Sequence, residues 1–273
     1  MADRLPPSMA TLGKEFLTLY DIPHLCPICG RVKEIAQGRA ISDELAADWR
    51  LTEEQRRFFD FREGCSCRHC GSSVRRMEMG MALLEVLNLR SGECLQFVKD
   101  LPAWEGAARL KIAEINNCGS LHGYLQQLPG LVYSEYGSQD PLLSSEDLSQ
   151  LSYGDDSFDL VLHSDVLEHV PDYRQALAES RRVLKADGVL VFTVPFLLDR
   201  PTVRRAVLAG GEVRHLCSPS YHGEYRLRLG DYLVYHEFGH DFVEELAGYF
   251  DTAVYGYSGY SGSISSVFVC RRR

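Results

Sequence analysis

Two short cysteine motifs carry the clearest potential chemistry in this sequence. Cys26 and Cys29 stand in CPICG, and Cys67 and Cys70 stand in CRHCG. In each motif two thiols three positions apart are followed by a glycine, a spacing that lets a tight turn direct both sulfurs at one ion. Four thiolates form a closed tetrahedral zinc site without an open coordination position, so we expect a structural rather than a catalytic metal.

The other cysteines leave alternatives open. Cys65 or His69 is a possible substitute within the ligand set, and unrelated buried cysteines are the simplest competing interpretation. A redox function is disfavoured, because neither pair follows a strand and opens a helix. Four further cysteines are isolated and typical of ordinary core or surface thiols, namely Cys94, Cys118, Cys217 and Cys270.

A second motif, HEFGH at residues 236–240, matches the HExxH pattern of zinc proteases. That chemistry requires both histidines on one helical turn. Here Gly239 interrupts the motif, the preceding DYLVY favours β structure, and a helix is expected to begin only at Asp241. No acidic or histidine residue follows Asp251 to provide a distal third ligand. We therefore interpret the motif as a chance match.

The elements that position these residues differ between the two parts of the chain. In the first part we expect a helical insert at 41–59, with helix starts at Ser42 and Thr52, and an amphipathic helix at 75–89. From Arg109 onward apolar runs alternate with helical patterns, which predicts a parallel sheet with helices on both faces. The expected strands are 110–115, 131–136, 158–164 and 189–195, followed by a terminal pair at 250–257 and 263–270 that suits a hairpin at one edge; the expected helices are 121–128, 172–184 and 241–249.

The pattern predicts two units. A zinc-binding module with a helical insert is expected at residues 1–92, and an α/β domain at 93–273. Hydrophobic residues make up 45% and charged residues 25% of the chain, as in globular proteins. No run of about 18 apolar residues is present to span a membrane, and the N-terminal residues lack the apolar core of a secretory signal. Nine cysteines without an export signal favour a reducing compartment, so the expected location is cytoplasmic.

Charge is unevenly divided along the chain. Residues 1–90 contain 13 basic and 13 acidic residues, so the net charge of −9 belongs entirely to the remainder. An acidic surface repels phosphates, which makes a nucleic-acid partner unlikely although it leaves room for a local basic groove.

Residues 152–196 contain a recognisable sequence, SYGDDSFDLVLHSDVLEHVPDYRQALAESRRVLKADGVLVFTVPF. It closely resembles class I S-adenosylmethionine-dependent methyltransferases of the broad small-molecule group. An acidic-aromatic turn enters a strand that ends near Ser164, and a helix leads through LKADG into the next strand. The resemblance implies a Rossmann-like, mostly parallel seven-stranded sheet. It also implies a transferase in which an acceptor O, N or S of a small molecule attacks the sulfonium methyl in line.

The resemblance implies a set of cofactor-binding residues. Glu114 ends the first strand, where the family places an acidic residue near the amino acid moiety, and Glu135 ends the second, where a carboxylate accepts the ribose hydroxyls. The intervening loop NNCGS departs from the family, because it contains only one glycine. An acidic residue at a strand end is equally often solvated or capping, but together at family spacing the two favour binding. The full set is Glu114, Asn116, Gly119, Glu135, Asp147, Leu148, Ser164 and Asp165. The gap between Glu135 and Asp147 is short, so the usual helix there must be reduced or missing.

Three histidines are candidates for a general base that deprotonates the acceptor, namely His169, His222 and His236. A histidine that opens a helix after a loop, as His169 does, is more often structural. The other two lie in an insertion at 197–240 that in this family often covers the acceptor pocket. Its aromatic residues, Tyr221, Tyr225, Tyr232 and Tyr235, suit either an enclosure for a small substrate or a packed lid. The transfer step needs no magnesium, and no acidic metal cluster is evident.

Two rival functions remain. An RNA methyltransferase would use the zinc module to grip its substrate, which a concentrated basic stripe would support. A non-catalytic or repurposed binding protein on a methyltransferase scaffold would explain the loss of glycines from the loop.

Overall fold

The computed structural model describes residues 17–21, 24–222, 233–258 and 264–273. Its central feature is a twisted sheet with the strand order β1-β13-β14-β7-β6-β4-β5. The strands of this sheet are β1 (Leu17–Asp21), β4 (Ile112–Ile115), β5 (Leu131–Ser134), β6 (Phe158–Ser164), β7 (Leu184–Thr193), β13 (Asp251–Ser258) and β14 (Ile264–Arg271). All neighbouring pairs are parallel except those of β14, which runs antiparallel to β13 and β7. The predicted α/β fold with a mostly parallel sheet is confirmed.

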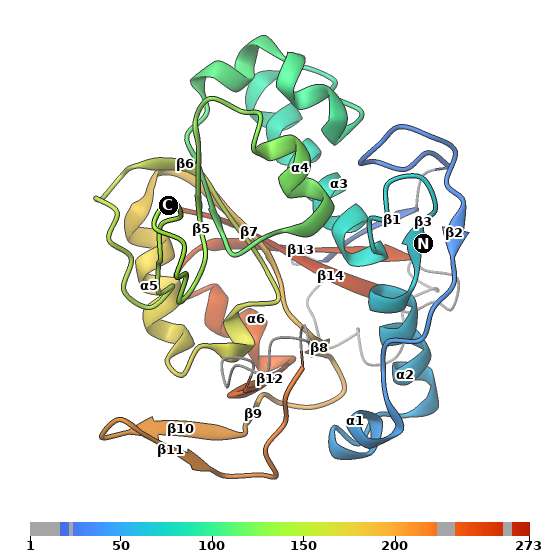
Figure 1. Cartoon of the computed structure of the whole chain (residues 1–273), viewed down its shortest axis with the longest axis vertical. Coiled ribbons are helices and arrows are strands. Elements are labelled where there is room, and N and C mark those ends of the chain that lie inside the picture. Colours follow the sequence, from blue (N-terminus) through green and yellow to red (C-terminus); the bar gives the residue numbers. More distant parts are fainter. Residues whose placement is uncertain (1–16, 22–23, 223–232, 259–263) are drawn as a thin grey trace.

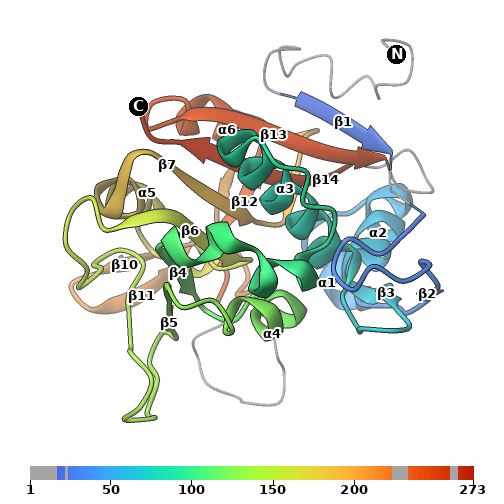
Figure 2. The same cartoon turned by 90° about the horizontal axis from the view of Figure 1, so that it is seen from above.

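The origin of the strands differs from the expectation. Residues 112–271 supply six strands of this sheet. The expectation that the α/β domain itself supplies all seven was therefore wrong. The remaining place is taken by β1 from the N-terminal segment, which runs alongside β13 (Figure 2). The terminal pair β13–β14 therefore lies inside the sheet and not at its edge. Residues 135–157, all described, form neither a helix nor a named strand; isolated bridges join Ser134 to Ser144 and Asp147 to Gln150.

Helices cover both faces of the sheet, as expected. On one face α3 (Val74–Ser91) and α4 (His122–Leu125) pack on alternate strand residues, and on the other α5 (Tyr173–Val183) and α6 (Asp241–Leu246) pack on the intervening ones. In Figure 1 the strands β7, β13 and β14 run between these two groups of helices. Because α3 belongs to the front third of the chain, the front third and the sheet share one hydrophobic core. The division at residues 92 and 93 stays a prediction.

The helix starts follow from capping side chains. Ser42 accepts a hydrogen bond from the Leu45 N–H and caps α1 (Asp43–Asp48). Thr52 and Gln55 form a reciprocal capping box at α2 (Glu53–Phe59). Ser73 and Asp172 cap α3 and α5 as Ser42 caps α1, with the side chain accepting the N–H of Arg76 and of Gln175, respectively. The described residues also form a π-helical turn, η3 (Asp60–Gly64), and the 3₁₀ turns η4 (Val98–Ala103), η5 (Glu105–Arg109), η6 (Gly119–Leu121) and η7 (Leu167–His169).

Short strands outside the main sheet organise the cysteine motifs and the insertion. Strands β2 (Ile35–Ala36) and β3 (Ser66–Cys67) pair beside the cysteines. In the insertion β12 (His236–Gly239) lies between β8 (Phe196–Leu197) and β9 (Val203–Arg204), while β10 (Ala206–Ala209) and β11 (Glu212–His215) form a projecting hairpin (Figure 1). Within the described residues, no helix combines the length and apolar character needed to cross a membrane.

Candidate functional site

The four predicted zinc ligands lie together. The sulfurs of Cys26, Cys29, Cys67 and Cys70 are all within 4.8 Å of one another. The Cys26 and Cys70 sulfurs are 3.7 Å apart, and those of Cys29 and Cys67 are 4.0 Å apart. Four sulfurs at about 2.3 Å from a tetrahedral zinc ion are about 3.8 Å from one another. The cluster therefore has the dimensions of a tetrathiolate zinc site.

The two motifs form equivalent turns. Gly30 and Gly71 both have a φ of 71°, and each donates its N–H to the carbonyl of the first cysteine of its motif at 2.8 Å. A positive φ is readily adopted only by glycine, which explains its place in both motifs. Burial raises the pKa of the Cys26 thiol. Burial also acts on Cys67, but backbone N–H groups of Cys70 and His69 outweigh it and lower the pKa of this thiol.

The two alternative ligands lie outside this cluster. The thiol of Cys65 is buried but is not grouped with the four sulfurs, and His69 Nε2 lies 3.9 Å from Glu34 Oε1. The cysteine cluster is therefore complete without either residue.

Glu114 fixes the loop after β4 through contacts of its buried carboxylate. This side chain is fully buried, and its oxygens accept the Cys118 N–H at 2.8 Å and contact His122 Nδ1 at 2.7 Å. Burial raises the pKa of the Glu114 carboxyl. Asn116 has a φ of 59° and accepts the Tyr136 N–H through Oδ1 at 2.8 Å. Glu114 and Asn116, both predicted to contact the cofactor, thus stabilise the conformation of the loop through internal hydrogen bonds.

The glycine of this loop faces an arginine. Gly119 has a φ of 65°, and a Cβ at this position would collide with the guanidinium of Arg76 from α3. Arg76 forms no ion pair with any residue that the structure describes, and its Nε is buried without a hydrogen-bond partner. A free cation therefore lies against the loop that the sequence assigned to the cofactor.

Glu135 stands at the carboxyl end of β5, next to the loop. Its backbone N–H donates to the Ser144 carbonyl at 3.0 Å, and its carboxylate accepts the hydroxyl of Tyr133. The side chain is only partly buried. Of the two predicted acidic residues at strand ends, Glu135 is the one accessible from outside.

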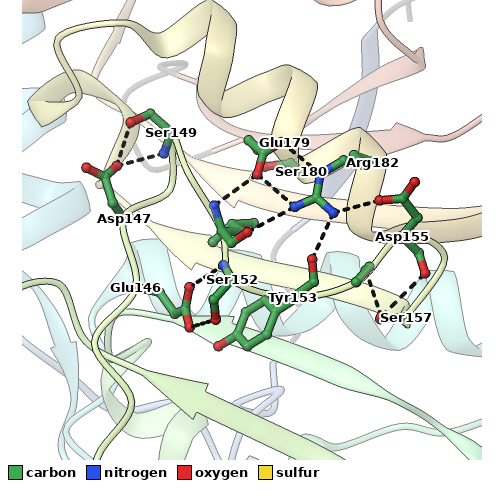
Figure 3. Close-up of polar contacts among 12 residues, drawn as sticks. Glu146, Asp147, Ser149, Ser152, Tyr153, Asp155, Ser157, Glu179, Ser180 and Arg182 are labelled. Carbon is green, nitrogen blue, oxygen red and sulfur yellow. Dashed lines mark hydrogen bonds and ion pairs between the residues drawn. The ribbon is translucent and has the colours of Figure 1, made fainter.

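The segment predicted to lie beside the adenine forms a compact loop (Figure 3). Asp147 accepts hydrogen bonds from both the N–H and the hydroxyl of Ser149, at 2.8 and 2.7 Å. Leu148 is buried in the core against α5. In Figure 3 Asp147 is joined to Ser149 and lies apart from the contacts around Arg182, whereas Leu148 contributes to packing.

Arg182 of α5 anchors this loop (Figure 3). Its guanidinium donates to the carbonyls of Leu151 and Tyr153 at 3.0 and 2.8 Å and pairs with Glu179 and Asp155 at 2.8 and 2.7 Å. Glu179 also accepts the Leu151 N–H at 2.9 Å. The loop is thus fixed to a helix although it has no regular structure.

Ser164 and Asp165, which follow β6, are engaged by arginines from the front third of the chain. Arg62 contacts both oxygens of Asp165 at 3.0 Å. Arg75 donates to Ser164 Oγ at 2.7 Å and lies 3.2 Å from Asp165, and both arginines also pair with Glu63. Burial opposes ionisation of Asp165, but the two guanidinium groups hold the pKa of its carboxyl well below the usual range.

Two of the three predicted catalytic histidines lie together. Ligand atoms of His169, His222 and the neighbouring Glu168 are within 4.8 Å of one another. The rings of His169 and His222 are 4.8 Å apart, and Trp49 of the helical insert contacts His222 edge to face. Burial lowers the pKa of His222 to about 3 and also lowers the pKa of His169.

His236 lies apart from this cluster. It belongs to β12, where its ring packs on Tyr173 at 4.7 Å, and burial lowers its pKa to about 4. Glu237 pairs with Arg205 in the interior. Strand residues four positions apart are about 13 Å from each other, so the two histidines of HEFGH do not share an ion. Tyr221 is exposed and Tyr235 is buried, while Tyr225 and Tyr232 lie outside the described residues.

The sequence alone did not indicate the arginines. Arg62, Arg75 and Arg76 belong to no motif, and only the folding of η3 and α3 against the sheet brings them to the loops after β4 and β6. Glu168 directly precedes His169, and that adjacency was the one available signal for it.

Comparison with known families now bears on this arrangement. Residues 132–192 match a family described as a methyltransferase domain. The match runs from β5 into β7 and therefore includes Glu135 and the loops after both β5 and β6. It supports an S-adenosylmethionine-dependent methyltransferase. No curated protein matches the sequence.

Several solved structures are similar. The PH0226 protein from Pyrococcus horikoshii is 19% identical, with 75% of this chain and 94% of that chain covered at a TM-score of 0.45. An S-adenosylmethionine-dependent methyltransferase from Mesorhizobium loti is 16% identical, with 63% and 95% covered and a TM-score of 0.37. The DszA carbon methyltransferase is 18% identical, with 73% and 54% covered and a TM-score of 0.40. The chain spans about half the length of three further structures, at 45%, 51% and 47%.

Proposed function

We propose that this protein is an S-adenosylmethionine-dependent methyltransferase that acts on the O, N or S atom of a small-molecule acceptor. The observation that carries the proposal is the family match over residues 132–192, which falls on the parallel strands and on the loops at their carboxyl ends. Ligands of open parallel α/β sheets bind at that edge.

The described residues offer groups suited to this cofactor. The partly exposed carboxylate of Glu135 is placed to accept ribose hydroxyls. The unpaired guanidinium of Arg76 is suited to the carboxylate of the methionine moiety, close to Gly119. When bound, the cofactor supplies the methyl group of its sulfonium. The other predicted contacts, Glu114, Asn116, Asp147, Leu148, Ser164 and Asp165, would act mainly by holding the loops in place.

The acceptor would lie beside the insertion. His169 lies shortly after β6, His222 of the insertion packs against it, and His236 belongs to β12. A small molecule is favoured because the residues beyond Arg90 carry the whole net charge of −9, which disfavours a nucleic acid. No membrane partner is invoked. The protein's own contribution is to orient the acceptor and exclude water.

The four-cysteine cluster would bind structural zinc. Sulfur separations of 3.7 and 4.0 Å match the edges of a tetrahedral site, and four thiolates leave no open position for a substrate. Such a site requires reduced thiols, in keeping with a cytoplasmic location.

Titration calorimetry with S-adenosylmethionine tests the proposed activity. We expect the wild-type chain to bind, and Glu135→Ala to weaken binding by about 10- to 100-fold, since hydrogen bonds to a charged group contribute roughly 1.5–3 kcal/mol. Glu212→Ala, an exposed carboxylate on β11, is the matched control and should bind like the wild type. Absence of binding at high micromolar cofactor would overturn the assignment and favour a repurposed scaffold.

A further inference from the structure

A buried carboxylate lies beside the candidate acceptor site. Glu168 is fully buried, and neither of its carboxylate oxygens has a hydrogen-bond partner among the residues that the structure describes. An ionised carboxylate in the protein interior is costly unless it is paired or binds a metal. Burial accordingly raises the pKa of the Glu168 carboxyl well above its usual range in the protein alone.

Two imidazoles lie next to this carboxylate. Nε2 of His169 is 3.7 Å from Glu168 Oε1, and a ligand atom of His222 lies within 4.8 Å of both residues. His222 Nε2 is buried and has no hydrogen-bond partner in the described part of the chain. Ligands about 2.1 Å from one ion are at most about 4.2 Å apart, so the three groups need to close only slightly around it.

The ring of His169 is oriented as metal-binding histidines are. Its Nδ1 lies 3.0 Å from the Leu233 carbonyl and donates to it, which leaves Nε2 as the unprotonated nitrogen that faces Glu168. On the other side Trp49 packs against His222 with ring centroids 5.5 Å apart and donates from Nε1 to Ser220 at 2.9 Å. Both imidazoles are thus supported by groups outside the cluster.

The local charges leave room for a cation. Arg62 and Arg75 are balanced by Asp165 and Glu63, with which they pair. Glu168 feels Asp165 as a like charge and the two arginines as opposite charges, but it forms no bond with them. Ionised Glu168 would therefore add an uncompensated negative charge beside two neutral imidazoles.

We propose that Glu168, His169 and His222 bind a divalent transition-metal ion, such as zinc, at a site separate from the cysteine cluster. Two imidazoles and one carboxylate leave coordination positions open, in contrast to four thiolates. These positions are suited to an oxygen of a small molecule. If the protein is the proposed methyltransferase, that oxygen belongs to the acceptor, and the two histidines serve as ligands instead of bases.

Zinc content tests this proposal without reference to methyl transfer. The full chain is equilibrated by dialysis against micromolar Zn²⁺, and bound zinc is counted by mass spectrometry. We expect two ions per wild-type chain and one in both Glu168→Gln and His222→Ala. His215→Ala removes an exposed histidine on β11 and should retain two. Cobalt substitution distinguishes the sites, because only the cysteine cluster gives thiolate charge-transfer absorption.

The possible outcomes separate the two sites and the proposed activity. A wild-type chain that binds one ion, with the same count in both variants, overturns the proposal even if a variant folds poorly. One ion in the wild type and none in His222→Ala would support this site and refute the cysteine site. Cofactor binding is measured separately by calorimetry, so its failure leaves the zinc count interpretable.

Discussion

At the scale of single residues, the decisive feature is that charges predicted to meet a ligand meet other side chains. Asp165 stands at a φ of 51°, in the left-handed region where asparagine and aspartate are the most tolerated side-chain-bearing residues. Its carboxylate is held by Arg62, which is 2% exposed. The loop after β6 is therefore fixed to the front third of the chain by an ion pair in the interior.

Asp165→Asn should destabilise the protein without disturbing the backbone. Asparagine accepts the same φ and nearly the same volume, so the change removes only the charge and leaves Arg62 without its main partner. Breaking a buried pair in this way costs about 3–5 kcal/mol. Urea unfolding measures the loss.

An exposed ion pair provides the control for that substitution. Asp43 pairs with Arg39 and Arg56, but its side chain is 74% exposed. Asp43→Asn should cost less than about 1 kcal/mol, because water screens the pair. Equal losses in the two variants would contradict the structural assignment of Asp165.

At the scale of elements, the strands and capped helices could be predicted from local patterns. The strand at 158–164 has the predicted bounds, and the helices that follow Ser42, Thr52 and Asp172 begin where capping residues predict them. The predicted strand at 189–195 appears as β7, which begins earlier, at Leu184. These signals are local, because periodicity and capping act within a few residues.

Contacts between distant segments could not be predicted in this way. Nothing near Val74 indicates that α3 covers one face of the sheet, since an apolar helix face does not specify its partner. The arginines at the candidate cofactor site depend on that placement. The strand at 236–239 was also missed, because DYLVY favoured a strand one step earlier, at 231–235, where residues 231 and 232 lie outside the described residues.

A buried histidine in β6 should make the stability of the protein sensitive to acid. His163 is fully buried in this strand against Phe192, and neither ring nitrogen has a hydrogen-bond partner among the described residues. Burial lowers its pKa from the ordinary 6.5 to about 3. On acidification the unfolded chain takes up this proton first, so stability falls as the pH drops below about 6.5, and the loss continues down to the folded pKa.

His163→Leu should remove this part of the pH dependence. Between pH 7 and pH 5.5 the wild type should lose about 1 kcal/mol more of its free energy of unfolding than the variant does. Chemical denaturation at the two pH values measures the difference. An identical pH dependence in the two proteins would mean that His163 is hydrogen-bonded or exposed in solution.

At the scale of the whole molecule, the cysteine cluster and the sheet belong to one core. Cys26 and Cys67 pack in the same hydrophobic cluster as α3 and as Leu160 and Val189 of the sheet. Arg62 and Arg75 add ion pairs with Asp165 between the two parts. Loss of the proposed zinc should therefore destabilise the sheet as well as the region around the cysteines.

Cys29→Ser tests this coupling, because this side chain is a proposed zinc ligand that is only partly buried, so its packing loss is small. We expect the free energy of unfolding to fall by at least about 3 kcal/mol, a fraction of the roughly 10–16 kcal/mol with which structural zinc stabilises small domains. The variant should still unfold in a single transition. Its backbone amides should exchange hydrogen faster than in the wild type, in β7 as well as near the cysteines. Cys94→Ser, at an exposed thiol, should leave the transition unchanged. A separate early transition, with the sheet unaffected, would show that the cysteine module folds independently of the α/β domain.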